Sequence, residues 1–215
     1  MVVLGAIPGR FSYDGPMSTW SNKVFTEADI AEPDALSWAD CTFERCRFVH
    51  AELANLRTRR CELIDCDLSG ADLAGSRHDE TSFVSCSLRA ADLRSAVFWQ
   101  CRLTGSDFLG ASLEGLQIAG GDWSWVNFPA APLAEMDLRE VKLEGAYLAN
   151  SDLRGADLRH ARLTGAVLSR AQISGADLRG ALVEGTDLHT LDLRGVRVES
   201  AQAMAILTGL GLVVD

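Results

Sequence analysis

Cysteine, histidine and carboxylate side chains are the residues of this sequence that could carry chemistry. The cysteines do not form close pairs such as CxxC, which a zinc site would use together with nearby histidines. Instead, their positions differ by multiples of five. This spacing predicts small buried side chains, neither metal ligands nor disulfides. The six are Cys41, Cys46, Cys61, Cys66, Cys86 and Cys101.

The four histidines, His50, His78, His160 and His189, are scattered along the chain. The sequence has no P-loop, GxSxG, HExxH or strand-associated GxGxxG pattern that would unite a nucleophile, a base and an anion site. We therefore expect no enzyme activity, no catalytic residue, no metal and no cofactor.

Carboxylates dominate the charge, with 30 acidic against 20 basic residues and a formal net charge of −10. Such a balance favours a basic partner or simple solubility. Many aspartates directly precede a leucine, and the regularity of that pattern leads from the side chains to the elements that position them.

Residues 151–188 show a five-residue period, with an apolar residue at every fifth position and a small residue two places before it. Neither an α-helix, with a period of 3.6, nor an ordinary strand, with a period of 2.0, places such residues on one face. The phase runs through 32 positions from Phe43 to Val198, of which only Thr58 and His78 are not apolar. A fixed short period predicts a solenoid.

The tandem A(D/N)LXX pattern resembles the pentapeptide-repeat family. The resemblance implies an all-β fold, a right-handed quadrilateral β-helix with four pentapeptides per coil and about eight coils, followed by a short C-terminal α-helix. The corresponding domains are an N-terminal extension or cap at 1–37, the β-helix at 38–198 and a dimerising helix and tail at 199–215. Part of the extension is equally well interpreted as a disordered leader.

Several segments depart from the consensus. Residues 57–60 and 76–80 predict local bulges without insertions, and His78 is expected to be a buried, hydrogen-bonded residue. Residues 119–140 contain Pro129 and Pro132, which predicts a bend, a bulge or a loosened side. Trp125 is expected to point outward, folded over a neighbouring coil.

The composition of residues 199–208 predicts a helix that caps the open end of the β-helix. A two-fold dimer through this end would cover its apolar side chains. No membrane span or signal peptide is evident, so a cytoplasmic location is expected. The predicted dimer interface comprises Met204, Ile206, Leu207, Leu210 and Leu212.

Positions twenty residues apart should stack on one side, which places aspartates in columns with a spacing of about 4.8 Å. An acidic solenoid of this kind can imitate the charge of DNA. The alternative is that aspartate before leucine bonds the local backbone, and that arginines two residues later neutralise the charge.

Within the family, the chain resembles the MfpA and Qnr group, above all in its ending from Val198 to Asp215 and in the stretch 76–80. The resemblance implies a homodimeric DNA mimic that binds DNA gyrase, inhibits it or protects it from fluoroquinolones, and binds no nucleic acid itself. Self-protection of a toxin producer and a scaffold for an unrelated protein are the alternatives. The predicted mimic surface comprises Asp137, Asp152, Asp157, Asp177, Asp187 and Asp192.

Overall fold

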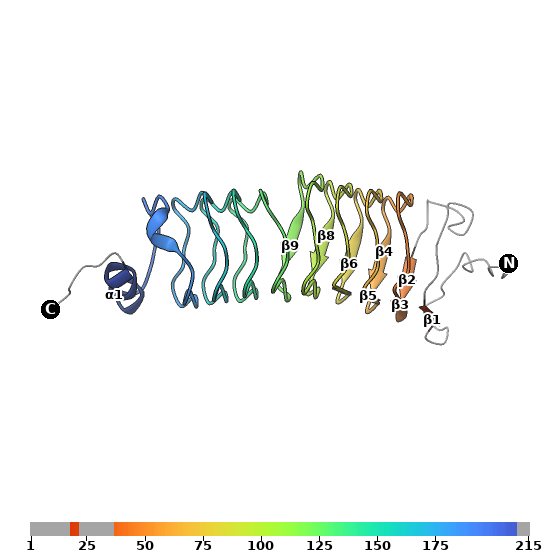
Figure 1. The fold of residues 1–215 in the computed structure, drawn as a ribbon, viewed down its shortest axis with the longest axis horizontal. Helices are drawn as coiled ribbons and strands as arrows, with labels where there is room; N and C mark the ends of the chain where they lie inside the picture. The colour runs from red at the N-terminus through yellow and green to blue at the C-terminus, as the bar shows by residue number, and fades with distance from the viewer. Residues whose placement is uncertain (1–17, 22–36, 210–215) are drawn as a thin grey trace. The chain divides into compact units, whose positions relative to one another are not determined.

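The structure is a computed structural model that describes residues 18–21 and 37–209. It is a parallel β-solenoid followed by a short helix (Figure 1). The chain divides into two compact units, residues 1–117 and 118–215. The five-residue phase runs through this division without a slip, so the sequence pattern does not predict it.

The N-terminal unit carries the strands, arranged in two parallel sheets. One sheet has the order β1-β3-β5-β7, and the other has the order β2-β4-β6-β8-β9, with β9 starting at the last residue of the unit. The strands are β1 Ser18–Ser21, β2 Ser37–Ala39, β3 Cys41–Glu44, β4 Arg57–Arg59, β5 Glu62–Ile64, β6 Arg77–Asp79, β7 Ser82–Val84, β8 Val97–Trp99 and β9 Gln117–Ala119.

Strand partners are twenty residues apart, so each coil contains four pentapeptides. In the N-terminal unit Thr42 pairs with Glu62, and in the C-terminal unit Asp157 pairs with Asp177 as an isolated bridge. β1 is offset, because Ser18 pairs with Cys41. Five residues of the N-terminal extension, Ser18–Ser21 of β1 and Ser37 of β2, thus join the ladders. The five-residue step from Phe25 to Ile30 lies outside the described residues.

Burial of side chains repeats every five residues, at the central residue and at the small residue two places before it. The central leucines Leu153 and Leu163 are fully buried, as is the small Ala156 two places before a central residue. The chain then turns with a residue in the left-handed region, such as Gly155 at φ 66°. The cysteines occupy the same small inward position, and all six are buried free thiols, as predicted.

The predicted bulges at 57–60 and 76–80 are wrong. Within these segments Arg57–Arg59 form β4 and Arg77–Asp79 form β6, and the two strands pair in an uninterrupted parallel register, Arg57 with Arg77 and Arg59 with Asp79. Thr58 is buried at the central position, and its hydroxyl lies 2.8 Å from His78 Nδ1. The polar central residues therefore satisfy one another inside the coil, and no backbone distortion is needed.

The division between the two units falls at the start of the unusual segment 119–140. Within this segment Trp123 and Phe128 remain buried, and Pro132 pairs with Asp152. The backbone N–H of Asp152 donates to the carbonyl of Ala131 in the preceding coil. Proline lacks this donor, so Pro132 interrupts the series of N–H groups at the first coil of the C-terminal unit.

The predicted helix is confirmed as α1, Ser200–Gly209. The Gln202 side chain accepts the Glu199 N–H at 2.8 Å, as the third helical residue of a capping box does. Its amide also donates to the carbonyls of Leu178 and Ala181, which satisfies carbonyls of a late coil. Within the described residues no helix has the length and apolar character needed to cross a bilayer.

Candidate functional site

The predicted mimic aspartates lie in separate columns of the C-terminal unit. Asp137, Asp157 and Asp177 are ladder neighbours in successive coils. Asp152 pairs with Gln172, which separates it from Asp192 in a second column. These carboxylates therefore lie on more than one side of the solenoid.

Aspartates followed by leucine and arginine form a repeated arrangement that we call the Asp–Arg clamp. In the clamp of Asp157, the Arg159 backbone N–H and Nε donate to Oδ1 at 3.2 and 2.8 Å, and an Nη atom donates to Oδ2 at 2.6 Å. One arginine thus holds both carboxylate oxygens through two side-chain bonds and closes the turn through its backbone. The clamped pairs are Asp92–Arg94, Asp137–Arg139, Asp152–Arg154, Asp157–Arg159, Asp177–Arg179 and Asp192–Arg194.

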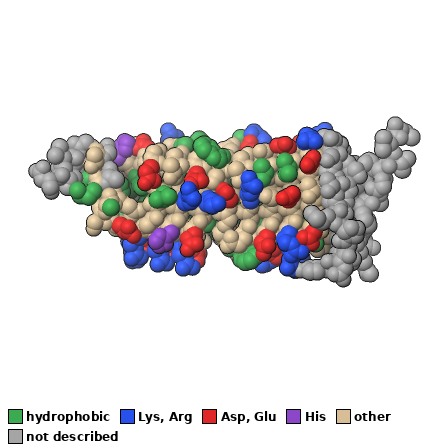
Figure 2. All heavy atoms as spheres, turned by 90° about the horizontal axis from the view of Figure 1, so that it is seen from below, with side chains coloured by type: hydrophobic (Ala, Val, Ile, Leu, Met, Phe, Trp, Pro, Cys, Tyr) green, Lys and Arg blue, Asp and Glu red, His purple; other side chains and the backbone are tan. Residues whose placement is uncertain are grey.

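The clamps keep the aspartates ionised and compensate their charge. Hydrogen bonds from Arg179 lower the pKa of Asp177 to about 2, and those from Arg159 lower the pKa of Asp157. Clamps also connect between coils, because Arg139 Nε lies 3.8 Å from Asp157 Oδ2. Figure 2 shows acidic and basic side chains interleaved on the face in view.

The remaining predicted carboxylate, Asp187, follows another pattern. Its Oδ1 lies 2.5 Å from Nδ1 of His189, two residues later. Five of the six predicted mimic carboxylates thus have an arginine at the second following residue, as the neutralising alternative anticipated, and Asp187 has a histidine there.

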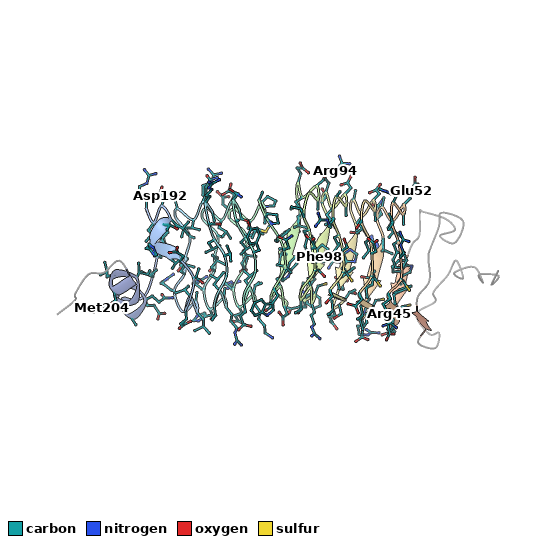
Figure 3. All side chains as sticks on the ribbon, viewed as in Figure 1. Arg45, Glu52, Arg94, Phe98, Asp192 and Met204 are labelled. Carbon is teal, nitrogen blue, oxygen red and sulfur yellow. The ribbon has the colours of Figure 1, made fainter. Side chains whose placement is uncertain are left out.

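A less compensated acidic column lies in the N-terminal unit. Glu52 pairs with Asp72 and Asp72 with Asp92 along one ladder. The next residue of this ladder is Ser112, and Glu114 follows it by two residues. Among the described residues Arg94 is the cation on this side. It clamps Asp92 and has its pKa raised by Asp92, Glu114 and Asp72. Figure 3 shows Arg94 and Glu52 projecting from the same side, whereas Phe98 lies inside.

We call Glu52, Asp72, Asp92 and Glu114 the acidic column. Asp72 accepts the N–H of Ala74 at 2.9 Å, because alanine takes the place that arginine has in a clamp. The predicted stacking of positions twenty residues apart applies to Glu52, Asp72 and Asp92, but the predicted mimic surface does not include them. The available signal was the residue two places later, which is Ala54 after Glu52 and Ala74 after Asp72.

The interior of the N-terminal unit holds a polar cluster. His78 is fully buried, and its Nε2 lies 2.9 Å from the Ser76 hydroxyl, opposite the contact with Thr58. Burial lowers the His78 pKa to about 3, so the ring is neutral at physiological pH. The prediction of a structural, hydrogen-bonded histidine is confirmed.

The buried thiols resemble core residues rather than reactive groups. Burial raises the pKa of Cys101 to about 12, and its Sγ donates to the carbonyl of His78 at 3.2 Å. In the part of the chain that the structure describes, no three His, Cys, Asp or Glu side chains are grouped to hold a metal ion.

Comparison with known proteins agrees with this geometry. The model of the pentapeptide-repeat family matches eight copies at residues 39–77, 81–116 and 133–170. The chain belongs to the pentapeptide-repeat family. No curated protein matches its sequence significantly.

Two solved structures share the fold of this chain. One trypsin-treated variant of QnrB1, a plasmid-mediated fluoroquinolone resistance protein, is 24% identical with a TM-score of 0.68, covering 93% of this chain and 99% of that one. A second trypsin-treated variant of QnrB1 is 24% identical with a TM-score of 0.67, covering 93% of this chain and 98% of that one. HetL, involved in heterocyst differentiation regulation in the cyanobacterium Nostoc, is 27% identical, with a TM-score of 0.49 and 84% of each chain covered.

The C-terminal end of this pentapeptide-repeat protein has an apolar surface. Met204 is 43% exposed, and Ile206 and Leu207 are partly buried. A cavity of about 350 Å³ lies between the last coil and α1, with Val183, Leu188 and Ile206 in its wall. Leu210 and Leu212, the other predicted interface residues, lie outside the described residues.

Proposed function

We propose that this pentapeptide-repeat protein is a DNA mimic that binds DNA gyrase in the cytoplasm, inhibiting the enzyme or protecting it from fluoroquinolones and other gyrase poisons. The proposal includes a right-handed, four-sided solenoid of about eight coils. The observation that carries it is the acidic column, in which Glu52, Asp72 and Asp92 occupy successive coils of a parallel ladder. Ladder neighbours are spaced about 4.8 Å apart, which approaches the phosphate spacing along a nucleic-acid strand.

The electrostatic argument favours the unclamped Glu52, Asp72 and Glu114 of the acidic column over the clamped aspartates, which include Asp92. A basic DNA-binding surface is attracted to uncompensated negative charge, and each clamp already supplies a cation to its carboxylate. Asp152, Asp157, Asp177 and the other predicted residues are part of the proposed surface, but they attract a basic partner less strongly. The sequence resemblance to the MfpA and Qnr group is a second, independent support.

Dimerisation through the C-terminal end is part of the same proposal. The exposed Met204, the partly buried Ile206 and Leu207, and the predicted contacts Leu210 and Leu212 would be covered together by a second copy. Ile206→Arg with Leu207→Arg should give a folded monomer by light scattering, because two charges would be buried in an apolar interface. A persisting dimer would place the interface elsewhere.

The direct test is supercoiling by purified gyrase in a titration with this protein, with and without a fluoroquinolone. Inhibition without drug supports gyrase as the target, and recovery of supercoiling in its presence supports protection. Absence of any effect at micromolar concentrations on gyrase from the same organism would refute the proposal and leave the fold unaffected.

A scaffold that binds an unrelated protein is the second candidate. It is favoured by the extent of charge compensation, since five of the six predicted aspartates are clamped by arginines and the acidic column is confined to one side of one unit. Inhibition of gyrase that does not change when carboxylates of the acidic column are neutralised would favour this candidate over mimicry.

A further inference from the structure

On one side of the C-terminal unit, the ladder positions and the positions two residues after them carry no charge over three coils, and the charged residue at the edge of this side is Arg170, directly after Ser169. The ladder series Asn127, Tyr147 and Val167 runs along it, and Asp187 is the first charged residue of that series. The other three sides carry ion pairs, such as Glu144–Arg162, Asp152–Arg154 and Asp157–Arg159. We call the uncharged part of this side the uncharged face. Its exposed or partly exposed residues are Trp125, Asn127, Pro129, Tyr147, Val167 and Ser169, whereas Ala149 is buried.

The uncharged face carries a continuous apolar strip. Trp125 is 67% exposed, Tyr147 43% and Val167 41%. Tyr147 and Val167 are ladder neighbours, and the Trp125 ring lies over Gly145, two residues before Tyr147. Exposed apolar side chains that adjoin one another in this way mark interaction sites more often than isolated ones do.

The backbone under the strip is already hydrogen-bonded. The N–H of Tyr147 donates to Val126 at 2.8 Å, that of Val167 to Ala146 at 2.9 Å, and that of Leu148 to the carbonyl of Val167 at 2.8 Å. A partner therefore cannot add a strand here and must be recognised through side chains. Within the described residues, the Trp125 indole N–H and the Tyr147 hydroxyl have no hydrogen-bond partner and can donate to a ligand.

These properties select one kind of ligand. A polyproline II segment makes no internal backbone bonds, loses little entropy on binding and docks on exposed aromatic rings, while its carbonyls accept from Trp and Tyr donors. We propose that the uncharged face binds an uncharged, proline-rich segment of a partner protein in the polyproline II conformation.

The size of the face favours a segment over a second copy of the chain. Three coils span roughly 10 Å between the outer ladder positions, so the face covers on the order of a few hundred Å². A stable interface between folded proteins buries about 800 Å² per partner. The proposal does not depend on binding to gyrase.

Fluorescence anisotropy of a labelled decaproline peptide tests the proposal, with a Gly-Ser decapeptide as the ligand control. We expect saturable binding of decaproline by the full chain and at least about tenfold weaker binding by Trp125→Ala and by Tyr147→Ala. Trp99→Ala is the matched control, because Trp99 is 42% exposed in the other unit, and it should bind within about twofold of wild type. Circular dichroism checks that each variant is folded.

Four results would overturn the proposal. They are no saturation up to about 1 mM peptide, equal binding of the Gly-Ser peptide, an unchanged affinity of Trp125→Ala, and loss of a dimer in that variant. The last result, by light scattering, would assign the face to a second copy. Because no gyrase is present in this assay, its outcome is separate from the supercoiling test.

Discussion

The two units build the same five-residue period from different side chains. The N-terminal unit has an aromatic and thiol core, in which Trp38 and Phe43 rings lie 4.8 Å apart and Phe98 lies 4.7 Å from His78. After Trp123 and Phe128, the C-terminal unit has an aliphatic core of leucines and alanines. On the outside, five of the six Asp–Arg clamps belong to the C-terminal unit.

The position after the central residue explains part of this difference. In the N-terminal unit it holds Ile64, Val84 and Trp99 within strands, and such residues favour extended structure. In the C-terminal unit the same position holds arginines such as Arg159, which fold back on the preceding aspartate. The inward residues thus set the phase, whereas this outward residue sets both the local backbone and the surface charge.

Truncation of a large core side chain should destabilise mainly the unit that contains it. Phe98→Ala should cost the N-terminal unit about 3–5 kcal/mol, because a fully buried ring is lost. Leu158→Ala is the counterpart in the C-terminal unit, with an expected cost of about 2–5 kcal/mol. Hydrogen exchange should show lost protection mainly in the altered unit, since coils contact only their neighbours. Uniform loss through both units in either variant would contradict this separation.

Acid should destabilise the N-terminal unit through His78. Its pKa is about 3 in the folded state and about 6.5 when unfolded, so the unfolded chain binds the extra proton between these values. Stability is therefore full above about pH 6.5 and falls as pH decreases, by about 2–3 kcal/mol at pH 4.5.

His78→Gln is the control, because it keeps a polar side chain but does not titrate. Denaturant unfolding at pH 7.5 and 4.5 should show the loss in wild type and not in the variant. An equal pH dependence in both proteins would show that other groups cause the acid sensitivity.

Substitution of two glycines at turns of the solenoid, Gly145 and Gly165, tests the outward position of Trp125. Gly145 and Gly165 have nearly equal φ values of 62° and 66°, so an alanine at either costs about 1 kcal/mol in backbone strain. The alanine methyl at 145 would overlap the Trp125 ring, whereas nothing lies within 4 Å of it at 165. Gly145→Ala should therefore cost about 0.5–1 kcal/mol more in thermal unfolding. Equal costs would mean that the ring moves freely aside.

A single clamp should contribute little to stability. Both partners of the Asp157–Arg159 pair are partly exposed, and ion pairs of this kind contribute about 0–1 kcal/mol. Arg159→Gln should change the free energy of unfolding by no more than this, measured in denaturant at low and high salt. A loss above about 2 kcal/mol would give the clamps a larger structural role than this comparison allows.

Much of the fold follows from the sequence because each repeat specifies its own geometry. The phase from Phe43 to Val198 predicts the inward residues, and the helix-forming composition predicts α1. The bulges at 57–60 and 76–80 were mispredicted because polar residues were assumed to disturb a coil. Thr58, Ser76 and His78 instead bond one another at buried positions, a pairing twenty residues apart that the local sequence does not display.

The candidate site is less predictable, because charge compensation depends on side-chain direction. The sequence places Asp157 and Arg159 two residues apart, and the structure turns both to one side so that they bond. The same spacing with alanine in place of arginine leaves Asp72 without a cation of its own. Alternation of aspartate with leucine therefore identifies the outside of the solenoid, while the second following residue decides which carboxylates carry uncompensated charge.

The most direct test compares two matched pairs of neutral substitutions in gyrase supercoiling. Glu52→Gln with Asp72→Asn removes two carboxylates from the acidic column, and Asp157→Asn with Asp177→Asn removes two clamped ones, so the net charge changes equally. The account predicts that the first pair weakens inhibition at least about tenfold and that the second stays within about threefold of wild type. Equal effects of the two pairs, or a larger effect of the clamped pair, would contradict the central role of the acidic column.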